Sequence, residues 1–146
     1  SRVERDTIAF SSAVSACEKA GEWQWALQFL HDMEDRHVAK TSITYNAAIS
    51  ACEKGDQWQS ALQLLEEMVG SRIDCCIITY NAAASACGNS GQWQIVLQLL
   101  VDMAYFHVDR DTTTYAVAVR ACERVLELQQ ASQILHDMFD DLADPM

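Results

Sequence analysis

The fold is decided by one stretch, residues 42–76, which reads SITYNAAISACEKGDQWQSALQLLEEMVGSRIDCC. Shifting it by 35 residues in either direction superimposes the same residue types with no insertion or deletion. The best-matched columns are Phe10, Tyr45, Tyr80 and Tyr115; Ala13, Ala48, Ala83 and Ala118; Gln28, Gln63, Gln98 and Gln133; and Met33, Met68, Met103 and Met138. The chain is therefore four tandem repeats, at about 7–41, 42–76, 77–111 and 112–146, which we expect to form one domain over 1–146.

Each repeat carries two helical patterns. In residues 42–76, apolar side chains recur at three- and four-residue steps on both sides of Gly55, which stands where a left-handed residue would end the first helix. Gly21 and Gly91 mark the corresponding turns, whereas the fourth repeat has 125–127 without a glycine. Neither helix can bury its apolar stripe alone, so each needs its hairpin partner and the next repeat. The pattern predicts an all-α fold, an α-α superhelix in the form of a right-handed solenoid of four helix-turn-helix repeats.

The composition narrows the classes of partner. With 21 acidic and 10 basic residues the net charge is −11, which works against a polyanion unless the basic groups gather on one face. No apolar run approaches the roughly 18 residues that span a bilayer, so we expect no membrane span. The chain starts without Met and enters the first repeat almost at once, so we expect a processed product or an excerpt of a longer protein.

Cysteine and tryptophan also follow the period. Equivalent positions in stacked repeats are usually farther apart than the roughly 7 Å that a disulfide allows, so we expect buried free thiols in a reducing compartment. No Cys-x-x-Cys pair is present, and we expect no metal site. The tryptophans share the apolar stripe of the second helix, which favours core packing over base stacking. The columns are Cys17, Cys52, Cys87 and Cys122, and Trp23, Trp58 and Trp93.

Three segments of the second repeat carry a resemblance to a known family. They are Ile43-Thr44-Tyr45-Asn46, Ile49-Ser50-Ala51-Cys52-Glu53-Lys54-Gly55, and Leu64-Leu65-Glu66-Glu67-Met68. With the 35-residue period, they resemble pentatricopeptide repeat proteins over essentially the whole chain, because tetratricopeptide repeats run to 34 residues with a different pattern. The resemblance implies single-stranded RNA binding in a plastid or mitochondrion, about one base per repeat, without a cofactor.

The resemblance also implies which side chains read each base: the residue after the aromatic of the first helix, and the last residue of the repeat. The pairs are Ser11 with Thr41, Asn46 with Cys76, and Asn81 with Asp111, while Ala116 with Met146 offers no polar reading group. Asn81 with Asp111 is a pair that the family commonly uses, for uracil. Asn46 suggests a pyrimidine, although Cys76 departs from the usual Asp or Asn, and Ser11 with Thr41 suggests a purine. The simpler interpretation of Asn46 and Asn81 is solvation or helix capping.

Two further columns are implied to touch the RNA. Apolar residues two positions before the aromatic would sandwich the bases, and they are Ile8, Ile43 and Ile78, with Thr113 departing. Basic residues near the end of the first helix would contact phosphate, and they are Lys19, Lys54 and Arg124, with Asn89 departing. The alternative is ordinary solvated charge that the helix dipole favours. Glu18, Glu53 and Glu123 lie directly beside the basic column and oppose a phosphate.

A protein partner is the competing interpretation. Solenoids present long surfaces to many ligands, so the chain could be a protein-binding scaffold subunit of a large organellar assembly such as a ribosome or photosynthetic complex. The imperfect reading pairs and the acidic balance favour this reading. We expect no enzyme and no catalytic residues, since there is no His-Glu-x-x-His and no Gly-rich phosphate loop.

Overall fold

The computed structural model describes residues 2–124 and 128–143, and within them it contains eight helices and no strand. The helices are α1 (Arg2–Ala20), α2 (Trp23–Asp35), α3 (Ser42–Lys54), α4 (Trp58–Gly70), α5 (Ile77–Asn89), α6 (Trp93–Tyr105), α7 (Thr112–Arg124) and α8 (Leu128–Ala143). Their starting points from α2 onward recur every 35 residues. The predicted all-α solenoid of helical hairpins is confirmed.

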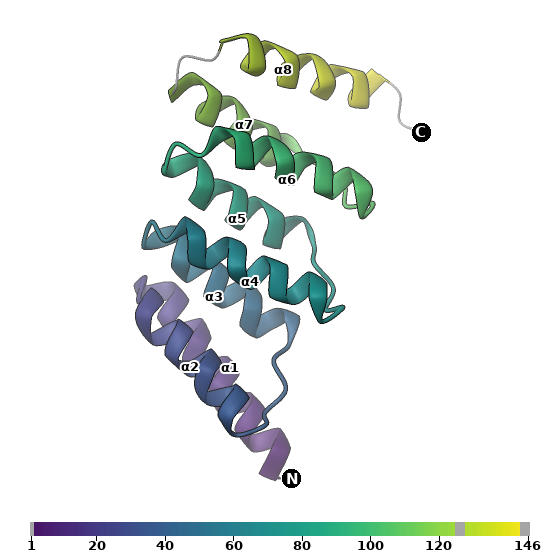
Figure 1. Cartoon of the computed structure of the whole chain (residues 1–146). Coiled ribbons are helices and arrows are strands. Elements are labelled where there is room, and N and C mark those ends of the chain that lie inside the picture. The colour runs from purple at the N-terminus through teal and green to yellow at the C-terminus, as the bar shows by residue number, and fades with distance from the viewer. Residues whose placement is uncertain (1, 125–127, 144–146) are drawn as a thin grey trace.

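The helices form two layers (Figure 1). In one layer α1, α3, α5 and α7 each contact the next, and each even-numbered helix packs against its hairpin partner. α2, α4 and α6 also contact the odd-numbered helix that follows, but within the described residues the even-numbered helices do not approach one another closely. The odd-numbered helices are therefore spaced more closely than the even-numbered helices, which curves the stack. The more closely spaced layer lies on the inner side of the curve, so the odd-numbered helices line the inner surface.

Residue size explains this difference between the layers. The odd-numbered helices meet through small side chains that are almost completely buried, namely Ala48, Ala51, Ala83, Ala86, Ala118 and Ala121. The buried residues of the even-numbered helices include larger side chains, such as Leu65 and Met68 in α4. Small residues let helix axes approach closely, and bulky ones hold them apart. The alanine columns therefore allow the odd-numbered helices to pack closely.

The turn between α3 and α4 differs from the prediction. Gly55 has φ −92°, and the left-handed residue is Asp56 with φ 57°, so the role predicted for Gly55 was wrong. Gly21 (φ 71°) and Gly91 (φ 77°) align with Asp56 instead. Gly55 is required by packing, because a Cβ atom there would lie 2.1 Å from Cδ1 of Trp23. The equivalent turn of the fourth repeat, 125–127, lies outside the described residues.

The tryptophans and cysteines lie where the period predicted. Trp23, Trp58 and Trp93 are half-buried and pack against the core, which confirms their interpretation as core residues. All six cysteines are thiols, and the four of the repeating column are buried. Burial raises the pKa of the Cys52 thiol to about 11 and that of Cys87 to about 12, so both are unreactive at neutral pH.

Each repeat depends on the next one for burial. Leu30, Leu65 and Leu100 are 4%, 4% and 5% exposed, whereas Leu135 at the same position in α8 is 41% exposed. The difference follows from stacking, because the first three are covered by the following hairpin. None of the helices in the described ranges has both the length and the apolar character that crossing a membrane requires.

Candidate nucleic-acid interface

The expected reading positions lie at the N-terminal ends of the odd-numbered helices. Thr41 and Cys76 are the N-cap residues of α3 and α5, and Asp111 accepts a hydrogen bond from the Thr114 backbone N–H at the start of α7. Asn46 and Asn81 lie in the second turns of α3 and α5. In the first three repeats the N-cap position therefore falls on the last residue of the repeat and not on the asparagines, which removes the capping interpretation of Asn46 and Asn81.

Asn81 and Asp111 meet across the junction between the third and fourth repeats. The Asn81 side-chain Nδ2 donates to Asp111 Oδ1 at 3.3 Å, although the two residues are 30 positions apart. Thr114, which is completely buried, donates through Oγ1 to Asn81 Oδ1 at 2.6 Å. Asp111 Oδ1 also accepts from the Thr114 backbone N–H at 2.9 Å. The stacking of α7 on α5 therefore assembles these three side chains into one network.

The network fixes which polar atoms face outward. Only the amide nitrogen of Asn81 can donate to a carboxylate, so the Asp111 contact sets the orientation of the amide. The Thr114 backbone N–H is the first cause that holds the pKa of the Asp111 carboxyl below its ordinary value, so this group is ionised at neutral pH. The half-buried amide retains a second N–H, and the exposed carboxylate retains Oδ2. A donor beside an acceptor matches the carbonyl and N–H of a pyrimidine edge such as that of uracil.

The other two pairs are less complete. Thr79 donates through Oγ1 to Asn46 Oδ1 at 2.5 Å, which orients this amide as Thr114 orients Asn81. Cys76 contacts Thr79 Oγ1 at 3.6 Å through its sulfur, and among the described residues no hydrogen bond joins it to Asn46. In the first pair, Ser11 has no amide group that could accept a hydrogen bond from Thr44, the equivalent of Thr79. Thr44 Oγ1 donates to the Thr41 backbone carbonyl at 2.8 Å. The structure joins Asn81 to Asp111 directly but does not join Ser11 to Thr41 or Asn46 to Cys76.

The isoleucine column is open to solvent. Ile8, Ile43 and Ile78 are 66%, 65% and 64% exposed, and they lie in α1, α3 and α5. Thr113, the residue that departs from the column, is also exposed at the start of α7. Three β-branched apolar residues with the same high exposure form a regular row that gains no burial from the fold itself.

The basic column is partly neutralised. Lys54 Nζ lies 3.0 Å from Glu18 Oε1 and donates to the Glu18 backbone carbonyl at 2.9 Å. This pair bridges the first and second repeats. Lys19 is exposed at the end of α1, whereas the side chain of Arg124 lies outside the described residues. Of the three predicted phosphate contacts, Lys54 is therefore already engaged by a carboxylate.

One basic residue of the inner layer was not predicted from the sequence. Arg120 is exposed on α7, one turn after Ala116, and lies with Asn89 beside a small cavity between α5 and α7. Its column in the other repeats is serine, at Ser15, Ser50 and Ser85. The signal was present as the one charged member of an otherwise neutral column. Arg120 places a positive charge on the fourth repeat, where Ala116 offers no polar group.

Two models of one repeat family match this chain. A "pentatricopeptide repeat domain" matches residues 2–55, and a "PPR repeat" matches residues 43–73 and 78–107. Together the matched segments cover more than half of the chain. The chain belongs to the pentatricopeptide repeat (PPR) family. A search of curated proteins found no match.

Solved PPR structures share the fold. PPR10 from maize, in a crystal structure in complex with an 18-nt psaJ RNA element, superimposes with a TM-score of 0.77 at 18% identity over 95% of this chain and 20% of PPR10. The PPR domain of Arabidopsis thaliana protein-only RNase P 1, in complex with tRNA, gives a TM-score of 0.83 at 14% identity over 92% of this chain and 72% of that domain. At these identities the likeness shows the fold. This PPR chain spans about a fifth of the length of PPR10.

Proposed function

We propose that this PPR chain binds single-stranded RNA along its odd-numbered helices, at about one base per repeat. The observation that carries the proposal is the hydrogen-bonded pair of Asn81 and Asp111, which presents a donor and an acceptor side by side on the inner layer. Both of the solved structures described above contain RNA, an 18-nt psaJ element in one and tRNA in the other. The pair suits uracil, as the family resemblance implies.

The remaining residues take supporting roles in this proposal. The isoleucines Ile8, Ile43 and Ile78 sandwich the bases, Asn46 with Cys76 accepts a pyrimidine, and Ser11 with Thr41 accepts a purine. Lys19, Lys54 and Arg124 contact phosphates. Stacking contributes roughly 1–3 kcal/mol per base, and association itself costs several kcal/mol, so four repeats bind weakly. We assign the repeats binding and no catalytic step, in a plastid or a mitochondrion.

The test is a titration of the chain with labelled RNA oligonucleotides in low salt, followed by fluorescence anisotropy. A purine-pyrimidine-uracil sequence should bind with a submillimolar Kd, and replacing the uracil by adenine should weaken it. Asn81→Ala should weaken the uracil-containing RNA about tenfold, which corresponds to about 1.4 kcal/mol. It should weaken the adenine-containing RNA much less.

The matched control is Gln59→Ala, which removes an exposed amide from α4 on the outer layer and should leave the affinity unchanged. Circular dichroism should show the same helix content in both variants. An absence of binding below millimolar RNA, or equal affinities for Asn81→Ala and the parent chain, contradicts the proposal.

A further inference from the structure

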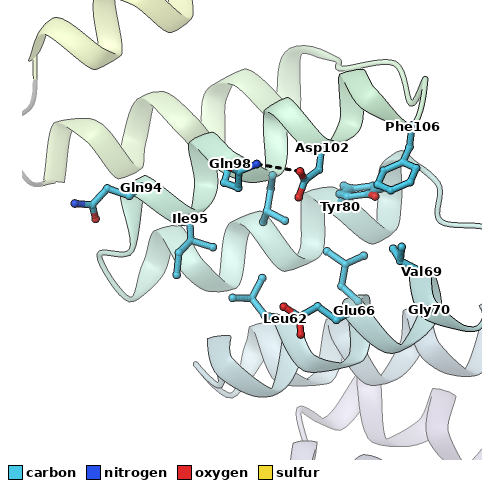
Figure 2. Close-up of a pocket in the computed structure, with 12 residues that line it drawn as sticks. Leu62, Glu66, Val69, Gly70, Tyr80, Gln94, Ile95, Gln98, Asp102 and Phe106 are labelled. Carbon is cyan, nitrogen blue, oxygen red and sulfur yellow. Dashed lines mark hydrogen bonds between the residues drawn. The ribbon is translucent and has the colours of Figure 1, made fainter.

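A groove of about 680 Å³ lies between α4 and α6 on the outer layer (Figure 2). Its walls are mainly apolar, with Leu62 and Val69 on the α4 side and Ile95 on α6, and Phe106 follows the end of α6. Glu66 and Asp102 add two carboxylates, one from each wall. The groove is therefore an apolar channel with acidic edges, on the layer opposite the odd-numbered helices that the RNA would follow.

The second and fourth repeats show what occupies the equivalent space. Lys40 lies 5.5 Å from the ring centroid of Tyr45 and 3.5 Å from Glu67 Oε2, and the Tyr45 hydroxyl donates to the same carboxylate oxygen at 2.8 Å. At the fourth repeat, Arg110 lies 5.4 Å from the ring of Tyr115 and 3.0 Å from Asp141 Oδ2, to which the Tyr115 hydroxyl also donates. Each tyrosine is therefore held in a clamp with a carboxylate from its own repeat and a cation from the end of the preceding repeat.

The clamp around Tyr80 lacks its cation, because Cys75 stands where Lys40 and Arg110 stand. Asp102 stands where Glu67 stands, whereas the position of Asp141 is occupied by Phe106. The remaining carboxylate, Asp102, accepts from Gln98 Nε2 at 3.0 Å, and no cation of the described residues lies within ion-pair distance of it.

Tyr80 is the second part of the clamp that remains. It is only 2% exposed and lines the groove next to Phe106 (Figure 2). Among the described residues its hydroxyl has no hydrogen-bond partner, although a buried tyrosine hydroxyl usually finds one. Burial is the main cause that raises the pKa of Tyr80 to about 12, so the hydroxyl is neutral.

We propose that this groove binds a protein partner through an arginine or lysine side chain that completes the clamp on Tyr80 and Asp102. The apolar walls select apolar side chains on both sides of that cation, as an amphipathic helix would present them. The carboxylates and the overall charge of −11 attract a basic segment and repel a polyanion. Binding here goes beyond the proposed RNA binding and uses the opposite layer.

A synthetic peptide pair tests the proposal. The probe is a 15-residue, end-capped helical peptide of Ala and Gln with one central Arg and Leu four residues before and after it. Its partner replaces Arg with citrulline, which keeps the shape and removes the charge. The Arg peptide should bind the full chain at least ten times more tightly than the citrulline peptide. In NMR spectra it should shift the signals of Tyr80, Ile95 and Asp102.

Cys75→Arg supplies the missing cation from within the chain, in the form that Arg110 already takes. This variant should keep its helix content and lose at least tenfold in affinity for the Arg peptide. Gln59→Arg adds the same charge on α4 outside the groove and should change the affinity less than twofold. Asp102→Asn should weaken the Arg peptide and leave the citrulline peptide unchanged.

Three results would overturn the proposal. They are equal affinities for the two peptides, unchanged binding to Cys75→Arg, and displacement of the peptide by a saturating RNA oligonucleotide. Displacement would place the peptide on the inner layer. Because the peptide titration contains no RNA, its outcome is independent of whether the chain binds RNA.

Discussion

At the scale of single residues, one column of threonines organises the candidate interface. Thr44, Thr79 and Thr114 are completely buried. A buried hydroxyl group normally needs hydrogen-bond partners, and these three have them. Each accepts a hydrogen bond from the backbone N–H of the N-cap residue three positions earlier. Thr79 and Thr114 also donate to the asparagine of the preceding repeat. One side chain therefore both helps to cap a helix and orients a reading residue.

Cys76 provides a test of the interface at this scale. Burial alone would raise the pKa of its thiol, but hydrogen bonds led by the Thr79 backbone N–H outweigh it, and the pKa is lowered. A lowered pKa means more thiolate at pH 8, so iodoacetamide should alkylate the exposed Cys76 at least ten times faster than the buried Cys52 or Cys87. Mass spectrometry of peptides should show this order.

The same labelling reports on RNA. If Cys76 lies beside a bound base, saturating RNA should slow its alkylation severalfold, while a Cys76→Ser variant identifies its signal. Rapid modification of Cys52 would contradict the burial, and a rate at Cys76 that RNA does not change would argue against its place at the interface.

At the scale of helices, the contact between Trp23 and Gly55 locks consecutive hairpins. Trp23 begins α2, and its ring covers the backbone of the glycine that ends α3 in the next repeat. The lack of a side chain at residue 55 is thus set by the neighbouring repeat and not by its own backbone angles.

Gly55→Ala should destabilise the chain by about 1–3 kcal/mol, because a Cβ there would force the indole to move. Thermal unfolding followed by circular dichroism measures the effect. The control is Gly70→Ala, where a Cβ meets nothing within 4 Å at the end of α4, and which should be neutral or slightly stabilising. In a Trp23→Leu background the cost of Gly55→Ala should shrink. A full cost in that background would exclude Trp23 as the cause.

At the scale of the whole molecule, ion pairs between repeats absorb part of the acidic excess. Lys54 bridges to Glu18, Lys40 bridges Glu34 and Glu67, and Arg110 bridges to Asp141. Within the described residues, these basic side chains are already paired with carboxylates and are less available to bind a polyanion. The resulting surface suits weak RNA binding on the inner layer and attraction of a basic partner on the outer layer.

Glu18→Gln should therefore strengthen RNA binding. The variant releases Lys54 from its carboxylate partner and reduces the local negative charge, so we expect affinity to rise about two- to fivefold in low salt. The slope of log affinity against log salt should steepen by up to about 0.7 if Lys54 then neutralises one phosphate. Asp32→Asn changes the net charge equally on α2, where Asp32 bonds to Gln28, and should have a smaller effect. Equal effects of the two variants would show that only net charge matters.

The amino-acid sequence alone determined the architecture, because a 35-residue apolar period with small residues in one helix can be buried only by stacking hairpins. The period also identified the thiols and tryptophans as core, and the resemblance to pentatricopeptide repeats implied that Asn81 and Asp111 form a pair. Tertiary structure decided the rest. Which residues meet 22 to 36 positions apart depends on how far each hairpin is offset from the next, so the Glu18–Lys54 pair, the Tyr45–Glu67 bond and the Trp23–Gly55 contact could not be read from periodicity. The incomplete clamp at Tyr80 is likewise recognised only by comparison with the two complete clamps. The sequence shows a cysteine at residue 75, but only the structure shows that the equivalent residues Lys40 and Arg110 contact a tyrosine ring and a carboxylate.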